Sequence, residues 1–440
     1  MGKFYRFIPH LTYLKKITRH KGRNGSWIMS SKKPFTDGKL YGKVNGEATI
    51  IHFFFDPLEY GFTQKNFIES TILINIRTFI TCNGNFSYPM ENVQLTYRSL
   101  QLHKFLDLMP RYEISPNFDN GLCGQVSCIL DTTNLISEKL INDCNVKIQP
   151  YLSCTWGGSK FKFYPEILIS VSLIRDELDL LKIYDSIIKL IQYAFMRTNI
   201  YPDSFYIQIN NGLKGEVYSN ITNVYIEEPE DCNTIWRDSI PWSIYYEHML
   251  DIFEQIYNGN WYMDNIPQTK DERFFVSDVI ISKEAAAFEH EFNESFPKGL
   301  PTHSDSRLAI EEEVKQELVP LFESSSGKKR KIYKGFIDHI RNDALVDKLE
   351  YCFTQYASCL EWIYSKLGKD MSFEKMSEIC SNIRNDVDHG NKKIVINDEV
   401  ARGYGIMRAL IYAMQMKRMG YEEKGINIAI KNLFSMKGII

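Results

Sequence analysis

Three side chains near residue 385 could together cleave RNA. Arg384 and His389 are separated by four residues, and Asn385 directly follows the arginine. An imidazole can move a proton near neutral pH, and a guanidinium can hold a phosphate with two hydrogen bonds while it stabilises the charge of the transition state. These groups suffice for the attack of a ribose 2′-hydroxyl on its neighbouring phosphodiester, with no metal or other cofactor. Because DNA lacks this nucleophile, the chemistry would be specific for RNA.

The same residues also have a purely structural interpretation. Ile383 and Val387 are expected to face the core of a helical bundle, so Arg384 and Asp388 lie one turn apart on the neighbouring face and can form a surface ion pair. His389 would then only complement the negative end of the helix dipole. An arginine and a histidine at this spacing occur together by chance in many proteins, so the spacing alone favours the structural interpretation.

The chain around these residues has the periodicity of helices. Apolar residues recur at spacings of three and four, which is typical of helices that bury one face. Helices are expected at residues 281–296, 308–322, 344–367 and 398–419, and a further one is expected to begin after the N-cap Ser372 and to end at Gly390. Pro320 should end or kink its helix near the last turn. This half of the chain is therefore predicted to be an antiparallel helical bundle.

The first half of the chain has mostly the period of β-strands. Residues 205–210 alternate between apolar and polar types, and one helix is expected at residues 178–191. Further strands are expected at residues 48–55, 71–82 and 167–173. The acidic stretch 227–231 breaks this pattern. The sequence therefore predicts an α+β protein with a β-rich domain over residues 1–235 and an α-helical domain over residues 236–440.

Charge and cysteine usage exclude several classes of protein. The 440 residues carry a formal net charge of −3 and nine cysteines, none of them in a Cys-x-x-Cys pair. This composition argues against a disulfide framework and a zinc ribbon and favours the reducing cytoplasm. No stretch has the roughly 20 apolar residues of a membrane-spanning helix, so a soluble protein is expected. Residues 38–44 differ from a phosphate-binding loop in spacing and carry Val44 where a hydroxyl is needed, so nucleotide hydrolysis is rejected.

Two short basic stretches are candidates for contacts with RNA phosphates. They consist of Lys328, Lys329, Arg330 and Lys331, and of Lys392 and Lys393. The first stretch follows a run of serines and a glycine at residues 324–327, so it is predicted to be a flexible connection. A solvated loop with no RNA contact is the alternative.

Residues 384–390 resemble the motif of the HEPN superfamily, which consists of an arginine, four to six residues, and a histidine, with a polar residue after the arginine. More specifically, the chain resembles the ApeA-like HEPN proteins of bacterial anti-phage defence, which combine a β-rich N-terminal domain with a C-terminal helical one. Residues 287–290 and 38–55 also look like parts of that family. The resemblance implies an endoribonuclease of abortive infection that acts on RNA, with tRNA and other structured RNAs as candidate substrates and a phage-derived molecule as a candidate trigger.

The resemblance further implies roles for individual residues. One set of Arg384 and His389 would be half of a composite site, completed in a homodimer or a higher even oligomer, and Asn385 would orient the arginine or the phosphate. Glu289 matches an acidic residue of the family and either supports the site or joins a buried polar network; Asp388 is a second supporting residue. Some HEPN domains are not nucleases, so a non-catalytic scaffold that binds RNA or protein is the alternative function.

Overall fold

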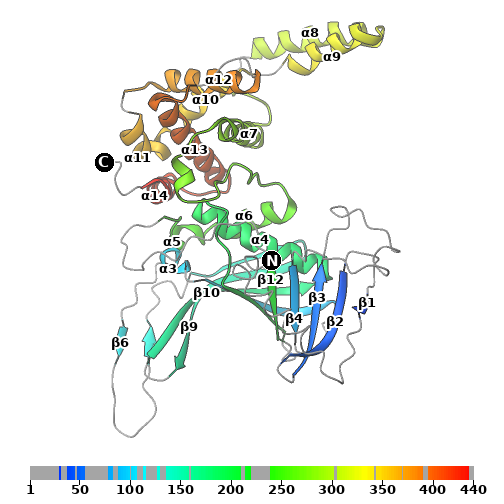
Figure 1. Ribbon diagram of the computed structural model, residues 1–440. Helices are drawn as coiled ribbons and strands as arrows, with labels where there is room; N and C mark the ends of the chain where they lie inside the picture. Colours follow the sequence, from blue (N-terminus) through cyan, green and yellow to red (C-terminus); the bar gives the residue numbers. More distant parts are fainter. Residues whose placement is uncertain are drawn as a thin grey trace. The chain divides into compact units, whose positions relative to one another are not determined.

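The chain folds into two compact units, residues Met1–Asn260 and Trp261–Ile440, called the first and the second unit below. The structure, a computed structural model (Figure 1), describes residues 29–30, 37–44, 47–54, 78–82, 88–99, 101–106, 112–114, 126–128, 135–157, 160–209, 214–219, 238–301, 305–340, 343–368, 370–389 and 395–435. A large antiparallel sheet precedes a helical region, which confirms the predicted α+β class.

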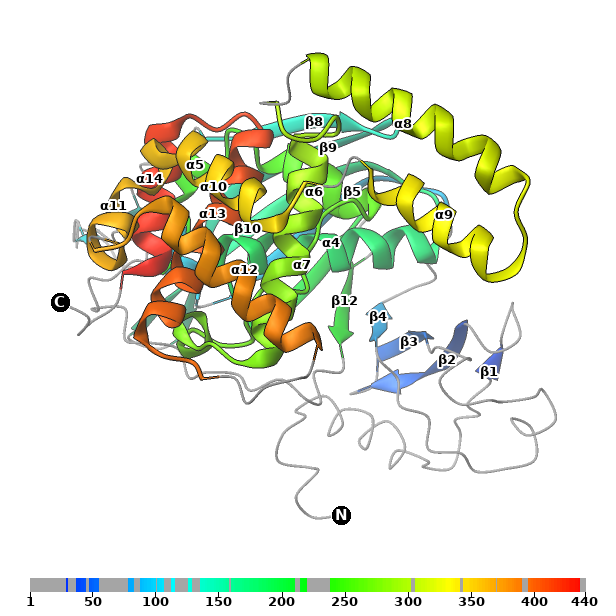
Figure 2. The same cartoon turned by 90° about the horizontal axis from the view of Figure 1, so that it is seen from above.

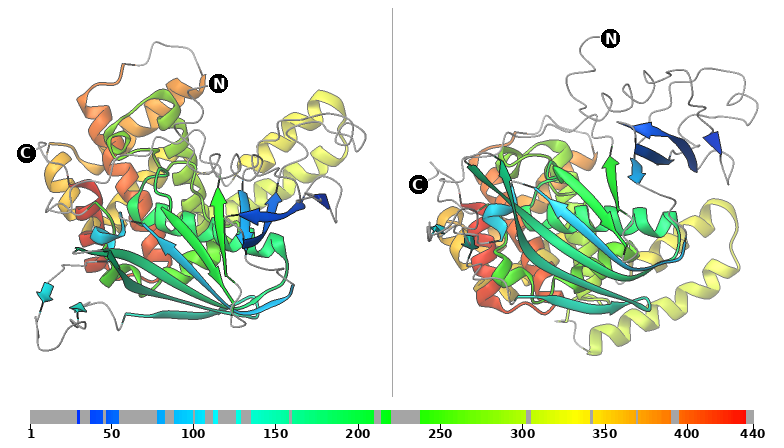
Figure 3. Two further views of the ribbon diagram at one scale, coloured as in Figure 1. Left: turned by 60° about the horizontal axis from the view of Figure 1, so that its bottom comes forward. Right: turned by 90° about the horizontal axis from the view of Figure 1, so that it is seen from below.

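Among the described residues of the first unit, ten strands form one antiparallel sheet, in the order β1-β2-β3-β4-β12-β11-β5-β10-β9-β8 (Figure 3). The strands are β1 (Met29–Ser30), β2 (Asp37–Val44), β3 (Glu47–Phe54), β4 (Thr78–Cys82), β5 (Met90–Arg98), β8 (Ser137–Ile141), β9 (Cys144–Gly157), β10 (Lys160–Ile174), β11 (Ser204–Gln208) and β12 (Lys214–Ser219), while β6 (Tyr112–Ile114) and β7 (Val126–Cys128) pair separately. Ile207, Leu95, Ile169 and Ile148 are register partners across four neighbouring strands. All four are buried, so the alternation seen in the sequence forms one row of the core.

Helix α4 (Glu177–Phe195) packs on this sheet, where the rings of Tyr184 and of Phe205 in β11 form a T-shaped pair with their centroids 4.8 Å apart. Asp176 caps the helix by accepting a hydrogen bond from the Asp179 amide at 2.8 Å. The predicted helix at residues 178–191 is confirmed, but Leu178 at its start is 61% exposed and takes no part in the core. The buried face begins at Leu180 and continues through Ile183 and Ile187, so it is rotated around the helix from the stripe that the sequence spacing indicates.

The division between the units lies beyond the boundary predicted near residue 235. Two helices that the sequence assigned to the second domain, α5 (Trp242–Tyr245) and α6 (Met249–Asn258), belong to the first unit. The rings of Trp242 and of Phe105 in the short helix α3 (Leu102–Phe105) form a T-shaped pair with their centroids 5.3 Å apart. Helix α6 packs on α4 and β8, and Lys139 of β8 forms ion pairs with Asp251 and Glu254. These tertiary contacts are not encoded in the helical period that guided the prediction.

The described part of the second unit is helical (Figure 2). It contains the 3₁₀ helix η3 (Asp271–Phe274) and the helices α7 (Asp278–Ser295), α8 (Asp305–Glu323), α9 (Gly327–His339), α10 (Leu345–Gln355), α11 (Ala357–Leu367), α12 (Phe373–His389), α13 (Asp398–Arg418) and α14 (Glu423–Phe434). Helix α13 is buried on all sides from Ile406 to Met416 and packs against α7, α11, α12 and α14. A helix surrounded in this way is the centre of a bundle. No described helix combines the length and apolar composition that crossing a membrane requires.

The single helix predicted over residues 344–367 is wrong, because the chain forms α10 and α11 with a break at Tyr356. The backbone of Tyr356 has φ −103° and ψ 15°, outside the helical region. Phe353, Tyr356 and Leu360 nevertheless keep the helical spacing and are all buried. The apolar stripe thus continues across the break, and for this reason the spacing of apolar residues does not reveal the break. Gly368 follows the end of α11 as predicted.

The predicted flexible basic connection at residues 324–331 is also wrong, because its basic residues form the first turns of α9. Only the short turn before them is irregular, and it ends at Gly327, whose φ of +59° favours glycine. Lysine and arginine are good helix formers, so they continue the chain as a helix. Pro320 does not end α8, since the helix continues past it to Glu323.

Candidate functional site

Helix α12 positions the candidate catalytic residues. Its first turn is capped by Ser372, whose Oγ accepts a hydrogen bond from the Lys375 amide at 3.2 Å. The buried face consists of Met376, Ser377, Cys380 and Ser381, whereas the predicted stripe residues Phe373, Ile379, Ile383 and Val387 are half-buried. The sequence period missed this rotation because two of the inward residues are serines. Tyr404 of α13 fixes the helix by donating a hydrogen bond from its hydroxyl to the Cys380 carbonyl at 3.0 Å.

Arg384 lies near the end of α12 and is held by its neighbours. Its Nε lies 3.0 Å from the Asp388 Oδ2, and both side chains are 37% exposed. Its Nη1 donates a hydrogen bond to the Asn385 Oδ1 at 3.2 Å. Asp388 also accepts a hydrogen bond from the Ser282 hydroxyl of α7 at 3.4 Å. The predicted pairing of Arg384 with Asp388 is thus present, and Ser282 joins it across a helix contact that the sequence did not indicate.

Other predicted site residues are not brought to Arg384 by any described contact. His389 is the last residue of α12, and its side chain lies outside the described residues, as do Lys392 and Lys393. Glu289 of α7 accepts a hydrogen bond from the Lys348 Nζ of α10 at 2.9 Å and is 34% exposed. Glu289 therefore links two helices of the bundle. The basic residues 328–331 are exposed on α9.

The buried acids of α7 are Glu284 and Glu291 rather than Glu289. Glu284 is fully buried, forms an ion pair with Arg408 of α13, and accepts a hydrogen bond from Asn265 Nδ2 at 3.3 Å. Glu291 binds both arms of Arg418, with Nε–Oε1 at 2.7 Å and Nη2–Oε2 at 3.0 Å. Burial raises the pKa of Glu291 above its ordinary value, although Arg418 opposes this shift. The sequence signal was available, since the two acids are seven residues apart and share the inward face of the helix.

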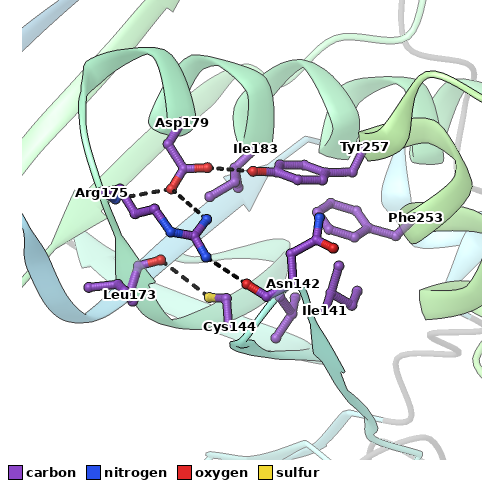
Figure 4. Close-up of a pocket in the computed structure, with 10 residues that line it drawn as sticks. Ile141, Asn142, Cys144, Leu173, Arg175, Asp179, Ile183, Phe253 and Tyr257 are labelled. Atoms are coloured by element: carbon purple, nitrogen blue, oxygen red, sulfur yellow. Dashed lines mark hydrogen bonds and ion pairs between the residues drawn. The ribbon is translucent and has the colours of Figure 1, made fainter.

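A small pocket in the first unit is a structural junction (Figure 4). It lies where the β8–β9 turn meets α4 and α6. The Tyr257 hydroxyl donates to the Asp179 Oδ1 at 2.5 Å, and the Arg175 Nη2 donates to the Asn142 carbonyl at 2.6 Å. Burial raises the pKa of Tyr257, so this phenol stays protonated. These polar groups point toward one another and are joined by hydrogen bonds, so they tie the β8–β9 turn to α4 and α6.

Cys380, one turn before Arg384, offers a probe of α12. Burial raises the pKa of its thiol to about 12, whereas a free cysteine has a pKa of about 8.5. Below about pH 8.5 the thiol is therefore protonated in both states, and its contribution to the free energy of unfolding is lost as the pH rises from there toward the folded value. At about pH 8 we expect a thiol reagent to leave Cys380 unlabelled in the folded protein and to label it in urea, as measured by mass spectrometry of its peptide. Equal labelling rates in both conditions would contradict the burial of this face.

Comparison of the chain with protein-family models, with curated proteins and with solved structures gave no match. The residues at the end of α12 are therefore the basis for a functional assignment. What they offer chemically is a half-exposed guanidinium whose present partners are a carboxylate and an amide oxygen. A phosphate oxygen can replace either of them without removing a group from the core.

Proposed function

We propose that this protein is a metal-independent endoribonuclease of the HEPN type. Arg384, Asn385 and His389 would form one half of its active site, and a second copy of the chain would supply the other half. The observation that carries the proposal is the half-exposed guanidinium of Arg384 at the end of α12. It donates a hydrogen bond to Asn385 and forms an ion pair with Asp388. His389 follows Asp388 directly in the sequence.

The proposed reaction requires one proton acceptor and one phosphate-binding cation. His389 takes the proton of a ribose 2′-hydroxyl, and the 2′-oxygen attacks the adjacent phosphorus. The bond between phosphorus and the 5′-oxygen then breaks, and the leaving oxygen takes up a proton. Arg384 holds the non-bridging oxygens while their negative charge increases. The products are a 2′,3′-cyclic phosphate and a 5′-hydroxyl.

Asp388 gives this site a resting arrangement. It occupies the guanidinium of Arg384 until a phosphate takes its place, and the hydroxyl of Ser282 remains available to bind the displaced carboxylate. Exchange of one anionic partner for another costs little, because the ion pair is more than a third exposed. The local acidity of the motif is thereby compatible with phosphate binding.

In the cell, such an enzyme would deplete host or phage RNA during abortive infection in the cytoplasm. Its substrates would include tRNA or other structured RNA, and a phage-derived molecule would trigger it. The first unit would act as the sensor or substrate selector. Lys392 and Lys393, which follow the motif in the sequence, are candidate contacts with the RNA backbone.

A second candidate function is a non-catalytic scaffold that binds RNA or protein through the same face. The observation in its favour is that Arg384 is already paired with Asp388 and Asn385. An arginine that only stabilises the end of a helix would have these contacts too.

The chemistry of the products separates these two functions. The full chain is incubated with total RNA in EDTA, and a matched DNA serves as the control. We expect RNA fragments with 2′,3′-cyclic phosphate and 5′-hydroxyl ends, and intact DNA, because only ribose carries the nucleophile. Fragments with 5′-phosphate ends would contradict the mechanism. If the enzyme needs a trigger, expression in the host replaces the assay in vitro: growth arrest with wild type and normal growth with His389→Ala are expected, and equal growth would favour the scaffold.

A further inference from the structure

Helices α8 and α9 form an arm that lacks a core of its own. They pack on each other, and neither packs extensively on another described helix or strand (Figure 1). Arg330 lies over the ring of Phe322 at 4.6 Å near the turn between them. No side chain from Ala309 to Asp338 is buried. Helices in proteins gain most of their stability by burying an apolar face, so an arm with no buried side chain would be stabilised by a partner.

Each helix of the arm carries exposed apolar side chains on a stripe. On α8 these are Ile310, Val314 and Leu321, and on α9 they are Ile332 and Phe336. The spacings of four and seven residues place each set on one side of its helix. The arm has five of the fourteen large apolar side chains that are exposed among the described residues. Such concentration of apolar surface is typical of a contact region.

The charges of the two helices are opposite and equal. Helix α8 has six carboxylates and two cations, a net charge of −4, and α9 has five cations and one carboxylate, a net charge of +4. The arm as a whole is therefore neutral and complementary to itself. A nucleic acid would be attracted by α9 but repelled by the equal charge of α8 beside it.

We propose that the arm is a self-association element on which the arm of a second copy of this chain packs. In an antiparallel four-helix bundle with a two-fold axis, each acidic α8 lies beside two basic helices, its own α9 and that of the partner. The two α8 helices lie on a diagonal, where their repulsion is weakest. The apolar stripes then fill the centre of the bundle. The arm would also supply the second copy that the proposed composite site needs, although the argument does not rest on that site.

The first test introduces a charge into the apolar stripes of the arm and measures the molecular mass of the protein in solution. The full chain is followed by sedimentation over a range of micromolar concentrations, as wild type and as Val314→Glu and Ile332→Glu. Ile428→Glu on α14 is the matched control, because Ile428 is 38% exposed, as Val314 is. All three sites are exposed, so the fold tolerates the changes. We expect the wild type to be a dimer. The dissociation constant of the dimer should rise by about a hundredfold in the two arm variants and stay unchanged in the control.

The second test exchanges the charges. Variant A has Lys328, Lys329, Arg330 and Lys331 changed to Glu, and variant B has Glu311, Glu312, Glu313 and Glu317 changed to Lys. Each alone should lose self-association, a mixture of A and B should form a heterodimer, and a chain with both exchanges should dimerise again. This recovery distinguishes lost complementarity from lost folding.

The proposal is overturned by a monomeric wild type, by arm variants that dimerise like the wild type, or by a doubly exchanged chain that stays monomeric. A wild-type monomer that binds single-stranded RNA through α9 would assign the basic residues to RNA instead. His389→Ala should dimerise as the wild type does. The molecular mass in solution therefore tests self-association through the arm, and RNA cleavage separately tests the proposed nuclease activity.

Discussion

Replacing Arg384 by alanine should lower the rate of RNA cleavage by about 10³–10⁵-fold, the range seen when an arginine that stabilises phosphoryl transfer is removed. His389→Ala should lower it by about 10²–10⁴-fold, the usual contribution of a general acid or base. Arg384→Lys should recover only part of the loss, since an ammonium lacks the planar fork that holds two phosphate oxygens. Single-turnover cleavage of a fluorescent RNA in EDTA measures all three.

Lys375→Ala is the matched control for Arg384. Lys375 lies on the same helix and pairs with Glu399 of α13 at 2.7 Å, and both side chains are exposed to an extent similar to Arg384 and Asp388. Loss of either surface ion pair should leave the free energy of unfolding nearly unchanged, because water and salt screen exposed charges. The two variants should therefore be equally stable, and only Arg384→Ala should be inactive. If Arg384→Ala keeps more than about a tenth of the wild-type rate, the guanidinium has no catalytic role.

Freeing the arginine tests the resting arrangement. Asp388→Asn removes the charge that occupies Arg384 and keeps the shape of the side chain. Under the nuclease proposal the variant should bind RNA more tightly and cleave at least as fast, because the phosphate no longer displaces a carboxylate. A scaffold in which the ion pair is purely structural would show neither gain.

The sequence correctly predicted those elements of the fold that have a clear local pattern of apolar and polar residues or a capping residue. The alternation at Phe205 and Ile207 correctly identified β11, and Ser372 correctly marked the start of α12. The break at Tyr356 was missed, since no glycine or proline marks it and the apolar spacing continues through it. Ser324 to Gly327 correctly indicated a turn, but its composition was extended in error to the basic residues that follow.

In the candidate site, too, the sequence predicted the contact within one helix and missed the contact between two helices. One helical turn fixes the pairing of Arg384 with Asp388, so the spacing was sufficient. The contact of Asp388 with Ser282 depends on how α7 packs against α12, and a single sequence contains no record of that packing. The composite site and the position of the His389 side chain remain predictions that the described residues do not test.

The bundle that carries α12 should depend strongly on the ion pair between Glu284 and Arg408. Their side chains are 0% and 2% exposed, and Arg408 also donates a hydrogen bond to the Arg273 carbonyl. Arg273 in turn donates to the Leu433 carbonyl at 2.9 Å, which connects η3 with α14. Arg408→Ala leaves a buried carboxylate without its cation and should lower the free energy of unfolding of the second unit by about 3–5 kcal/mol. Urea unfolding followed by circular dichroism measures this change.

Lys417→Ala on the same helix is the control, because Lys417 pairs with Glu423 at 3.3 Å on the surface, and loss of this exposed pair should leave the free energy of unfolding nearly unchanged. Arg408→Met combined with Glu284→Gln removes both charges and should be more stable than Arg408→Ala, since no carboxylate is left unpaired. A loss below about 1 kcal/mol in Arg408→Ala would mean that water or another cation reaches Glu284. Because α13 also holds Cys380 through Tyr404, loss of the pair should expose the Cys380 thiol to labelling. Stability of the bundle and order at the end of α12 should thus be lost together, which makes the buried pair a requirement for the site that Arg384 occupies.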